Sequence, residues 1–187
     1  MTTTPDKRDA ERLVSLLLER SVKRGEFVLA SGRKSDYYID ARRTTMSGEG
    51  QLLIGRLGLA ALDANGWVPR AVGGLTLGAD PVAYAIAHAA RHAGRVLDAF
   101  TVRKEAKTHG LGRRIEGCLT TGDAVVVVED VITTGHSALE AVAAVRQAGA
   151  QVLGVLALVD REEGGREAIT AGGVAVTALV LGSELRV

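Results

Sequence analysis

The sequence predicts an α/β fold in which helices flank a central, mainly parallel sheet. Along the 187 residues, short apolar runs alternate with longer runs whose hydrophobic residues recur at helical spacing. One apolar run consists of four consecutive valines at residues 125–128. These valines cannot alternate between a buried and an exposed face, so they indicate a strand that is buried on both sides. Such strands are typical of parallel sheets with right-handed crossover connections.

The first part of the chain predicts a helix followed by a hairpin. Residues 1 to about 7 are polar, and residues 9–22 carry Leu13, Leu16 and Leu17 at helical spacing. Two short β-prone runs, at 27–30 and 37–40, flank a polar turn, which is a hairpin signal. We expect residues 1–45 to form this helix and a small hairpin.

The rest of the chain alternates strands and helices without an internal repeat. We expect helices at residues 48–64, 79–93, 138–148 and, as a short turn, 166–171. We expect strands at residues 71–74, 96–102, 125–129, 152–159 and 174–181. The whole pattern predicts one domain at residues 1–187. Ligands of such sheets bind beyond the carboxyl ends of the strands, which directs attention to the residues after the valine strand.

Composition and charge narrow the class of protein. The net charge is +1, so no overall field attracts nucleic acid or a membrane. Cys118 is the only cysteine, which excludes an internal disulfide and fits a reducing compartment. We see no apolar run of signal-peptide kind and no stretch near the roughly 20 apolar residues of a membrane span. We therefore expect a cytoplasmic protein with neither nucleic-acid nor membrane partners.

The valine strand leads into two acids and a small polar turn, and residues 125–137 read VVVVEDVITTGHS. Gly135 permits a tight turn and Ser137 can cap the helix that follows. Free backbone N–H groups at such a helix start, together with the helix dipole, favour a phosphate. Glu129 and Asp130 would repel that phosphate, so they suit sugar hydroxyls or a metal ion. The combination describes a site for a ribose phosphate.

This stretch resembles the PRPP-binding signature of the type I phosphoribosyltransferases, in which two acids precede a T-T-G-x-S loop. An ordinary strand–turn–helix would explain the valines and the glycine but not the adjacent acids. The resemblance implies that the acids hold the ribose hydroxyls and that the turn binds the 5′-phosphate. The implied PRPP contacts here are Glu129, Asp130, Val131, Ile132, Thr133, Thr134, Gly135, His136 and Ser137.

A basic segment follows the strand expected at 96–102. Residues 103–114 read RKEAKTHGLGRR and contain five fixed cations and a histidine with almost no apolar anchor. A solvated loop is the ordinary explanation of such a run. Because these cations directly follow a buried strand in a nearly neutral chain, we favour a mobile loop at 103–117 that closes over a polyanion.

The run R-K-E-A-K-x-H-G in this segment resembles the catalytic loop of the orotate phosphoribosyltransferase family. The early F-x-L-x-S-G-x-x-S-x-Y-Y and the late D-R-x-E extend the likeness from about residue 26 to 163. The resemblance implies a type I phosphoribosyltransferase fold with a hairpin hood and a flexible catalytic loop. It also implies orotate and PRPP as substrates and a homodimer whose loops act across the interface. Mg²⁺ would be the cofactor, held mainly by PRPP and water with no protein metal site.

The same resemblance assigns further roles by position. The residues implied to bind the pyrophosphate portion of PRPP are Arg103, Lys104, Lys107 and His109. Those implied to act in catalysis are Lys107, as the principal loop cation, with Arg103 and Asp130. Those implied to contact orotate are Tyr38, Thr133 and Arg161. Lysines that some family members carry are replaced here by Ala30 and Gly78, so those two contacts are not transferred.

Other assignments are weaker. A phosphoribosyltransferase for another base would keep residues 129–137 but explains the loop and the hairpin less well. A non-catalytic, PRPP-sensing regulator would be expected to carry a DNA-binding domain or a strongly basic face. His88 and His92 have a spacing that can bind metal, but no third ligand accompanies them, so an exposed or packed pair is favoured. Trp67 is interpreted as a packing residue.

Overall fold

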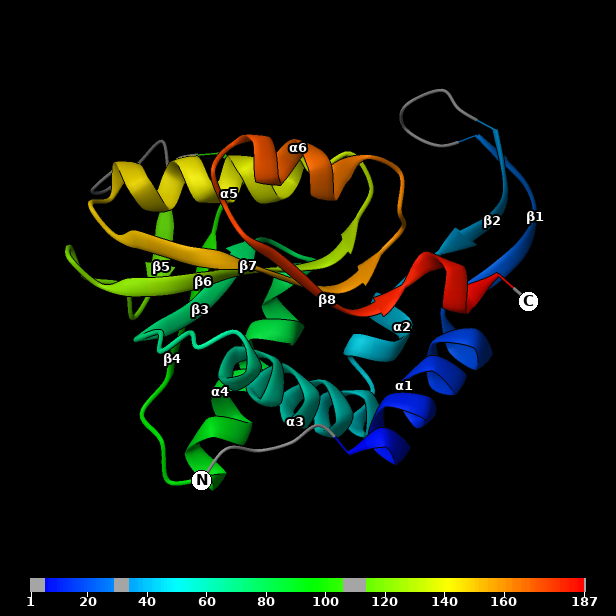
Figure 1. Cartoon of the computed structure of the whole chain (residues 1–187), viewed down its shortest axis with the longest axis horizontal. Coiled ribbons are helices and arrows are strands. Elements are labelled where there is room, and N and C mark those ends of the chain that lie inside the picture. The colour runs from blue at the N-terminus through cyan, green and yellow to red at the C-terminus, as the bar shows by residue number, and fades with distance from the viewer. Residues whose placement is uncertain (1–5, 29–33, 106–113, 187) are drawn as a thin grey trace.

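The computed structural model describes residues 6–28, 34–105 and 114–186 of the chain. Its centre is a six-stranded sheet in the order β5-β4-β3-β6-β7-β8 (Figure 1). The strands are β3 (Ala71–Leu75), β4 (Asp98–Val102), β5 (Ile115–Gly117), β6 (Ala124–Ile132), β7 (Gln151–Asp160) and β8 (Val176–Leu181). Neighbours pair in parallel except for β5, which is antiparallel to β4. The predicted central, mainly parallel sheet is confirmed.

Helices cover both faces of this sheet (Figure 1). Those on one face are α5 (His136–Gln147) and α6 (Gly165–Ala171), and those on the other are α1 (Lys7–Arg20), α3 (Gly48–Ala64) and α4 (Ala79–His92). In the part of the chain that the structure describes, no helix is both long and apolar enough to cross a membrane.

The valine strand contributes to both hydrophobic cores. Val125 and Val127 pack in the cluster that includes side chains of α5 and α6, whereas Val126 and Val128 pack in the cluster formed with α1, α3 and α4. All four valines are fully buried. Because successive strand residues point to opposite faces, a strand covered on both sides needs apolar residues at every position.

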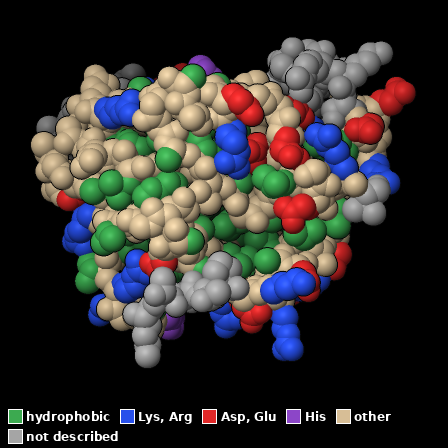
Figure 2. Space-filling view, viewed as in Figure 1, with side chains coloured by type: hydrophobic (Ala, Val, Ile, Leu, Met, Phe, Trp, Pro, Cys, Tyr) green, Lys and Arg blue, Asp and Glu red, His purple; other side chains and the backbone are tan. Residues whose placement is uncertain are grey.

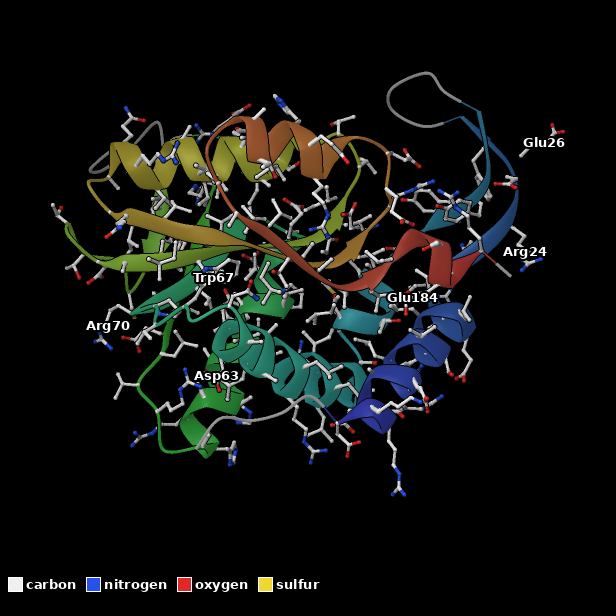
Figure 3. The ribbon with its side chains drawn as sticks, viewed as in Figure 1. Arg24, Glu26, Asp63, Trp67, Arg70 and Glu184 are labelled. Carbon is white, nitrogen blue, oxygen red and sulfur yellow. The ribbon has the colours of Figure 1, made fainter. Side chains whose placement is uncertain are left out.

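The predicted hairpin is confirmed and stands beside the sheet, close to the C-terminal end (Figure 1). It consists of β1 (Val22–Val28) and β2 (Lys34–Ile39), which pair antiparallel. Tyr37 and Ile39 are buried against the body of the protein, whereas Arg24 and Glu26 point into solvent (Figure 3). The connecting residues 29–33, which include Ala30, lie outside the described residues.

Trp67 is a packing residue, as the sequence predicts. Its side chain is buried with the cluster between the sheet and the helices α3 and α4 (Figure 3). A Cβ atom added to Gly154 of β7 would collide with the indole ring. Glycine at position 154 therefore leaves the space that the tryptophan fills.

The structure also departs from the sequence-based expectations. β6 continues through Ile132 rather than ending at 129, because Val131 and Ile132 pair with the last residues of β7. Three short elements were not anticipated, namely α2 (Arg42–Thr45), β5 and the 3₁₀ turn η1 (Gly182–Leu185). β5 falls inside the segment 103–117 that we expected to be a loop. Each of these elements has three or four residues, too few to show a hydrophobic period.

Candidate active site

Two carboxylates lie at the carboxyl end of β6. Glu129 is buried, with 6% of its surface exposed, and its Oε2 has no hydrogen-bond partner among the described residues. Asp130 is half-buried, and its Oδ1 accepts a hydrogen bond from the Val131 N–H at 2.9 Å. The site thus holds one acid that is desolvated and one that reaches the surface.

The connection between β3 and α4 packs directly on Asp130. A Cβ atom added to Gly78 would lie 2.5 Å from Asp130 Oδ1 and 2.6 Å from its Oδ2. A larger residue at position 78 would therefore displace the carboxylate.

Burial raises the pKa of the Glu129 carboxyl well above its ordinary value, and the neighbouring Asp130 carboxylate raises it further. The folded protein therefore binds a proton at Glu129 more tightly than the unfolded chain does. By linkage, the stability that this proton contributes is present at pH values below the ordinary pKa of 4.5 and is lost as the pH rises through the raised pKa.

We predict that Glu129→Gln removes this pH dependence. The free energy of unfolding of the wild type should decrease as the pH rises above about 4.5, whereas the variant should lack that component. Denaturant unfolding of both proteins between pH 5 and 8 would measure the two slopes. Glu167→Gln, at an exposed glutamate of α6, is the control and should keep the wild-type slope. Equal slopes in wild type and Glu129→Gln would contradict the raised pKa of the Glu129 carboxyl.

A backbone turn follows the acids and begins α5. The sequence suggests Ser137 as the helix cap, but Gly135 occupies that position, with φ +80° and no side-chain cap hydrogen bond. The first helical bond runs from Leu139 N–H to the Gly135 carbonyl at 3.0 Å. The N–H groups of residues 136–138 precede that bond, so helix geometry leaves them available to an anion. A cavity of about 30 Å³ lies at this turn, lined by Glu129 and residues 131–138.

A larger cavity, of about 600 Å³, lies at the carboxyl ends of β3 and β4. The residues that line it are Thr76, Leu77, Thr101, Arg103, Lys104, Glu105 and Glu116. The peptide bond between Thr76 and Leu77 is cis. This volume is within the usual range for ligand sites of about 300–1,000 Å³. Two of the cations predicted from the sequence, Arg103 and Lys104, are therefore placed at a cavity, whereas Lys107 and His109 lie outside the described residues.

Arg103 lies at the edge of this cavity with part of its hydrogen-bonding capacity unused. Its Nη1 is 3.8 Å from Glu116 Oε1, and its Nε is buried without a partner within the described residues. Its backbone N–H donates to the Arg114 carbonyl at 2.8 Å, and Arg114 Nε donates back to the Arg103 carbonyl at 3.1 Å. These bonds hold together the two ends of the basic segment 103–114.

The residues expected at orotate occupy different environments. Tyr38 is 39% exposed, and its ring centroid lies 5.7 Å from that of Phe27. Arg161 is only 3% exposed; its guanidinium stacks 4.4 Å above the Tyr37 ring, and its Nη2 contacts Glu163 at 2.9 Å. The Arg161 N–H also donates to the Ile132 carbonyl, which joins it to the end of β6.

Two residues near this region were missed by the sequence reasoning. The stacking partner Tyr37 could have been found from the adjacent tyrosines, since one of two neighbours in a strand faces inward. The second is Arg42, whose Nε donates to Asp40 Oδ1 at 2.8 Å. The Asp40 carboxylate, and to a smaller extent Asp130, raise the pKa of the Arg42 guanidinium. No sequence signal distinguishes this arginine from its neighbours.

Comparison with known proteins decides the family. No protein-family model matches the chain. The orotate phosphoribosyltransferase of Mycobacterium avium is 54% identical over 166 residues, which cover 89% of this chain and 90% of the relative. That of Corynebacterium glutamicum is 53% identical over 173 residues, with coverages of 92% and 91%. The chain belongs to the orotate phosphoribosyltransferase family.

Solved orotate phosphoribosyltransferases share the fold of this chain. The Mycobacterium tuberculosis enzyme in complex with PRPP has a TM-score of 0.82 and 45% identity, and the match covers 96% of this chain and 99% of that one. Its complex with Fe(III) dicitrate has a TM-score of 0.85 and 48% identity over the same shares. The adenine phosphoribosyltransferase of Leishmania donovani, at 17% identity and a TM-score of 0.65, shares the fold alone. The predicted fold is thereby confirmed.

Proposed function

We propose that the chain transfers ribose 5-phosphate from PRPP to orotate, giving orotidine 5′-monophosphate and pyrophosphate in pyrimidine biosynthesis. The observation that carries the proposal is the junction of two carboxylates and a glycine-capped helix start at the end of β6. Its support is the high identity to orotate phosphoribosyltransferases along almost the whole chain.

In this proposal the turn and the acids hold opposite ends of the sugar. The 5′-phosphate accepts hydrogen bonds from backbone N–H groups of residues 133–137, and the dipole of α5 favours its charge. The ribose hydroxyls donate to Glu129 and Asp130. Glu129 Oε2, buried without a partner among the described residues, is an acceptor of the kind that a sugar hydroxyl would satisfy.

The cavity beside Arg103 and Lys104 is the proposed site of the diphosphate. Negative charge develops on the diphosphate as it leaves the anomeric carbon, while the sugar becomes cationic, as in glycosyl transfer. Fixed cations at the leaving group and Asp130 near the sugar stabilise both charges. Orotate is already anionic and needs no strong base, so positioning and electrostatics account for catalysis. Tyr38, Thr133 and Arg161 stay the proposed orotate contacts.

The residues at the site fit Mg²⁺ without forming a cage around it. Within residues 6–28, 34–105 and 114–186, no group of three or more His, Cys, Asp and Glu side chains could hold a metal ion. Mg²⁺ prefers oxygen ligands and keeps several waters, so the Asp130 carboxylate would suit an ion carried in by PRPP. When bound, Mg²⁺ neutralises charge on the diphosphate. A homodimer and a cytoplasmic location stay predictions from the family resemblance and the composition.

The decisive test is the change in orotate absorbance when PRPP and Mg²⁺ are added to the purified protein. A fall in orotate that matches the pyrophosphate released would support the proposal. A panel of other bases tests the alternative of a different base. Pyrophosphate released with a purine but not with orotate would overturn the orotate assignment.

The face shown in Figure 2 gives no support to a non-catalytic regulator. On the face shown in Figure 2, the lysine and arginine side chains of the described residues are scattered rather than gathered into one basic patch. The net charge of +1 agrees with this distribution. Binding of PRPP without turnover would favour the regulator.

We predict that Lys107→Ala lowers kcat by about 100-fold or more, because the principal loop cation no longer meets the charge on the leaving group. Thermal unfolding should be little changed. Steady-state kinetics with saturating orotate and PRPP would measure the effect. Lys7→Ala, at a solvent-exposed lysine of α1, is the control. Wild-type turnover in Lys107→Ala would refute the role of the loop.

A further inference from the structure

A carboxylate behind one wall of the 600 Å³ cavity holds two of the hydroxyls that line it. Thr76 Oγ1 lies 2.6 Å from Asp80 Oδ2, and Thr101 Oγ1 lies 2.8 Å from Asp80 Oδ1. Tyr84 OH lies 3.3 Å from the same Thr101 oxygen. Thr76 and Thr101 line the cavity, whereas Asp80, in the first turn of α4, does not. The carboxylate therefore joins the carboxyl ends of β3 and β4 from behind.

The donors and acceptors in this cluster allow one arrangement of protons. An ionised carboxylate only accepts hydrogen bonds, and a hydroxyl has a single proton to donate. Thr76 and Thr101 therefore both donate to Asp80, and Tyr84 must donate to Thr101. Neither threonine has a proton left for the cavity, so each can offer only acceptor lone pairs to a ligand.

The rest of the cavity lining includes both acceptors, on the carboxylates of Glu105 and Glu116, and donors. Arg103 and Lys104 carry donors only, which suit phosphate oxygens. A bare diphosphate has acceptors on all sides and would find no hydroxyl donor on Thr76 or Thr101. The water shell of a divalent cation is rich in O–H donors, and Mg²⁺ retains several waters when it binds phosphates.

We propose that Asp80 is a positioning residue that makes the cavity selective for diphosphate in its magnesium complex. It acts by holding Thr76 and Thr101 with their acceptor lone pairs directed to water molecules on the ion. This role rests on the proposed function, because it takes the cavity to be the diphosphate site.

The test compares the affinity for pyrophosphate in excess MgCl₂ with that in EDTA, by isothermal titration calorimetry. In Asp80→Asn, the amide nitrogen must donate to one threonine, whose proton then becomes free to face the cavity. We expect Kd for magnesium pyrophosphate to rise and Kd for the metal-free ion to fall, so that their ratio changes by about tenfold. Thr101→Val, which removes one acceptor, should also weaken binding of the magnesium complex. It should leave binding of the metal-free ion little changed.

Thr177→Val is the matched control. Thr177 lies in β8, at the edge of the sheet opposite β5, and its hydroxyl donates to Asn65 Oδ1 at 2.9 Å. A merely structural role for Asp80 would weaken both forms of pyrophosphate equally. An unchanged ratio in both Asp80→Asn and Thr101→Val would overturn the proposal. If Asp80→Asn does not fold, Thr76→Val and Thr101→Val replace it. An unchanged ratio of the two Kd values in both threonine variants would then overturn the proposal. Orotate transfer by the wild type, measured separately, shows whether the proposed function fails or only this inference.

Discussion

Gly135→Ala is expected to abolish most PRPP-dependent activity, with kcat/KM falling by about 100-fold because the phosphate turn is displaced. Gly135 has φ +80°, a conformation that costs a residue with a Cβ roughly 1–2 kcal/mol. The new Cβ would also lie 2.7 Å from the Gly165 carbonyl and 3.0 Å from Ile169 Cγ1. Crowding of this kind costs about 1–3 kcal/mol, so the protein should also unfold more easily.

Gly173→Ala separates the effect of backbone strain from the effect of crowding around the added Cβ atom. Gly173 also has a positive φ, of +74°, but nothing lies within 4 Å of its added Cβ. This control should lose stability through backbone strain alone and keep its activity. Steady-state kinetics, PRPP binding by calorimetry and denaturant unfolding of the three proteins would make the comparison. Tight PRPP binding in Gly135→Ala would mean that the turn is not the phosphate site.

Asp130→Asn is expected to lower kcat/KM for PRPP by about 100-fold, because it removes a negative charge beside the developing cationic sugar. The substitution preserves the size of the side chain, which is packed on Gly78. It also removes one cause of the raised pKa of Glu129, so that pKa should move toward its ordinary value. The folded protein should be no less stable than the wild type near neutral pH.

Asp98→Asn is a suitable control for Asp130→Asn. Asp98 begins β4 and forms a partly exposed ion pair with Arg70 at 3.0 Å, an interaction that is worth at most about 1 kcal/mol. Initial rates at varied PRPP would distinguish the two variants. Unchanged kinetics in Asp130→Asn would remove this carboxylate from the site.

Much of the site could be predicted from short stretches of sequence. The valine run ending in two acids predicts both the central strand and the acidic end of the site, because burial on two faces leaves a clear apolar signal. The turn was likewise visible, although the cap is Gly135 rather than Ser137. A serine side chain can cap a helix only where the backbone places it at the N-cap position. Here that position has a positive φ, which favours glycine.

Other features depend on partners that are distant in the sequence. Nothing near Asp80 in the chain indicates that Thr101 will donate to it, or that Gly78 will pack against Asp130. The stacking of Arg161 on Tyr37 could not be predicted from local sequence either, because Arg161 follows β7 and Tyr37 belongs to the hairpin. The short strand β5 forms because β4 offers it an edge, not because its three residues favour a strand.

By itself, the sequence determined the alternation of strands and helices, the buried central strand and the order of acids, turn and basic segment. These properties are local, since they follow from hydrophobic period, backbone freedom and charge within a few residues. The tertiary structure alone decided which acid is desolvated, which tyrosine faces the arginine and which way the threonine protons point. Those outcomes depend on burial and on hydrogen-bond partners that meet only when separate strands are brought side by side.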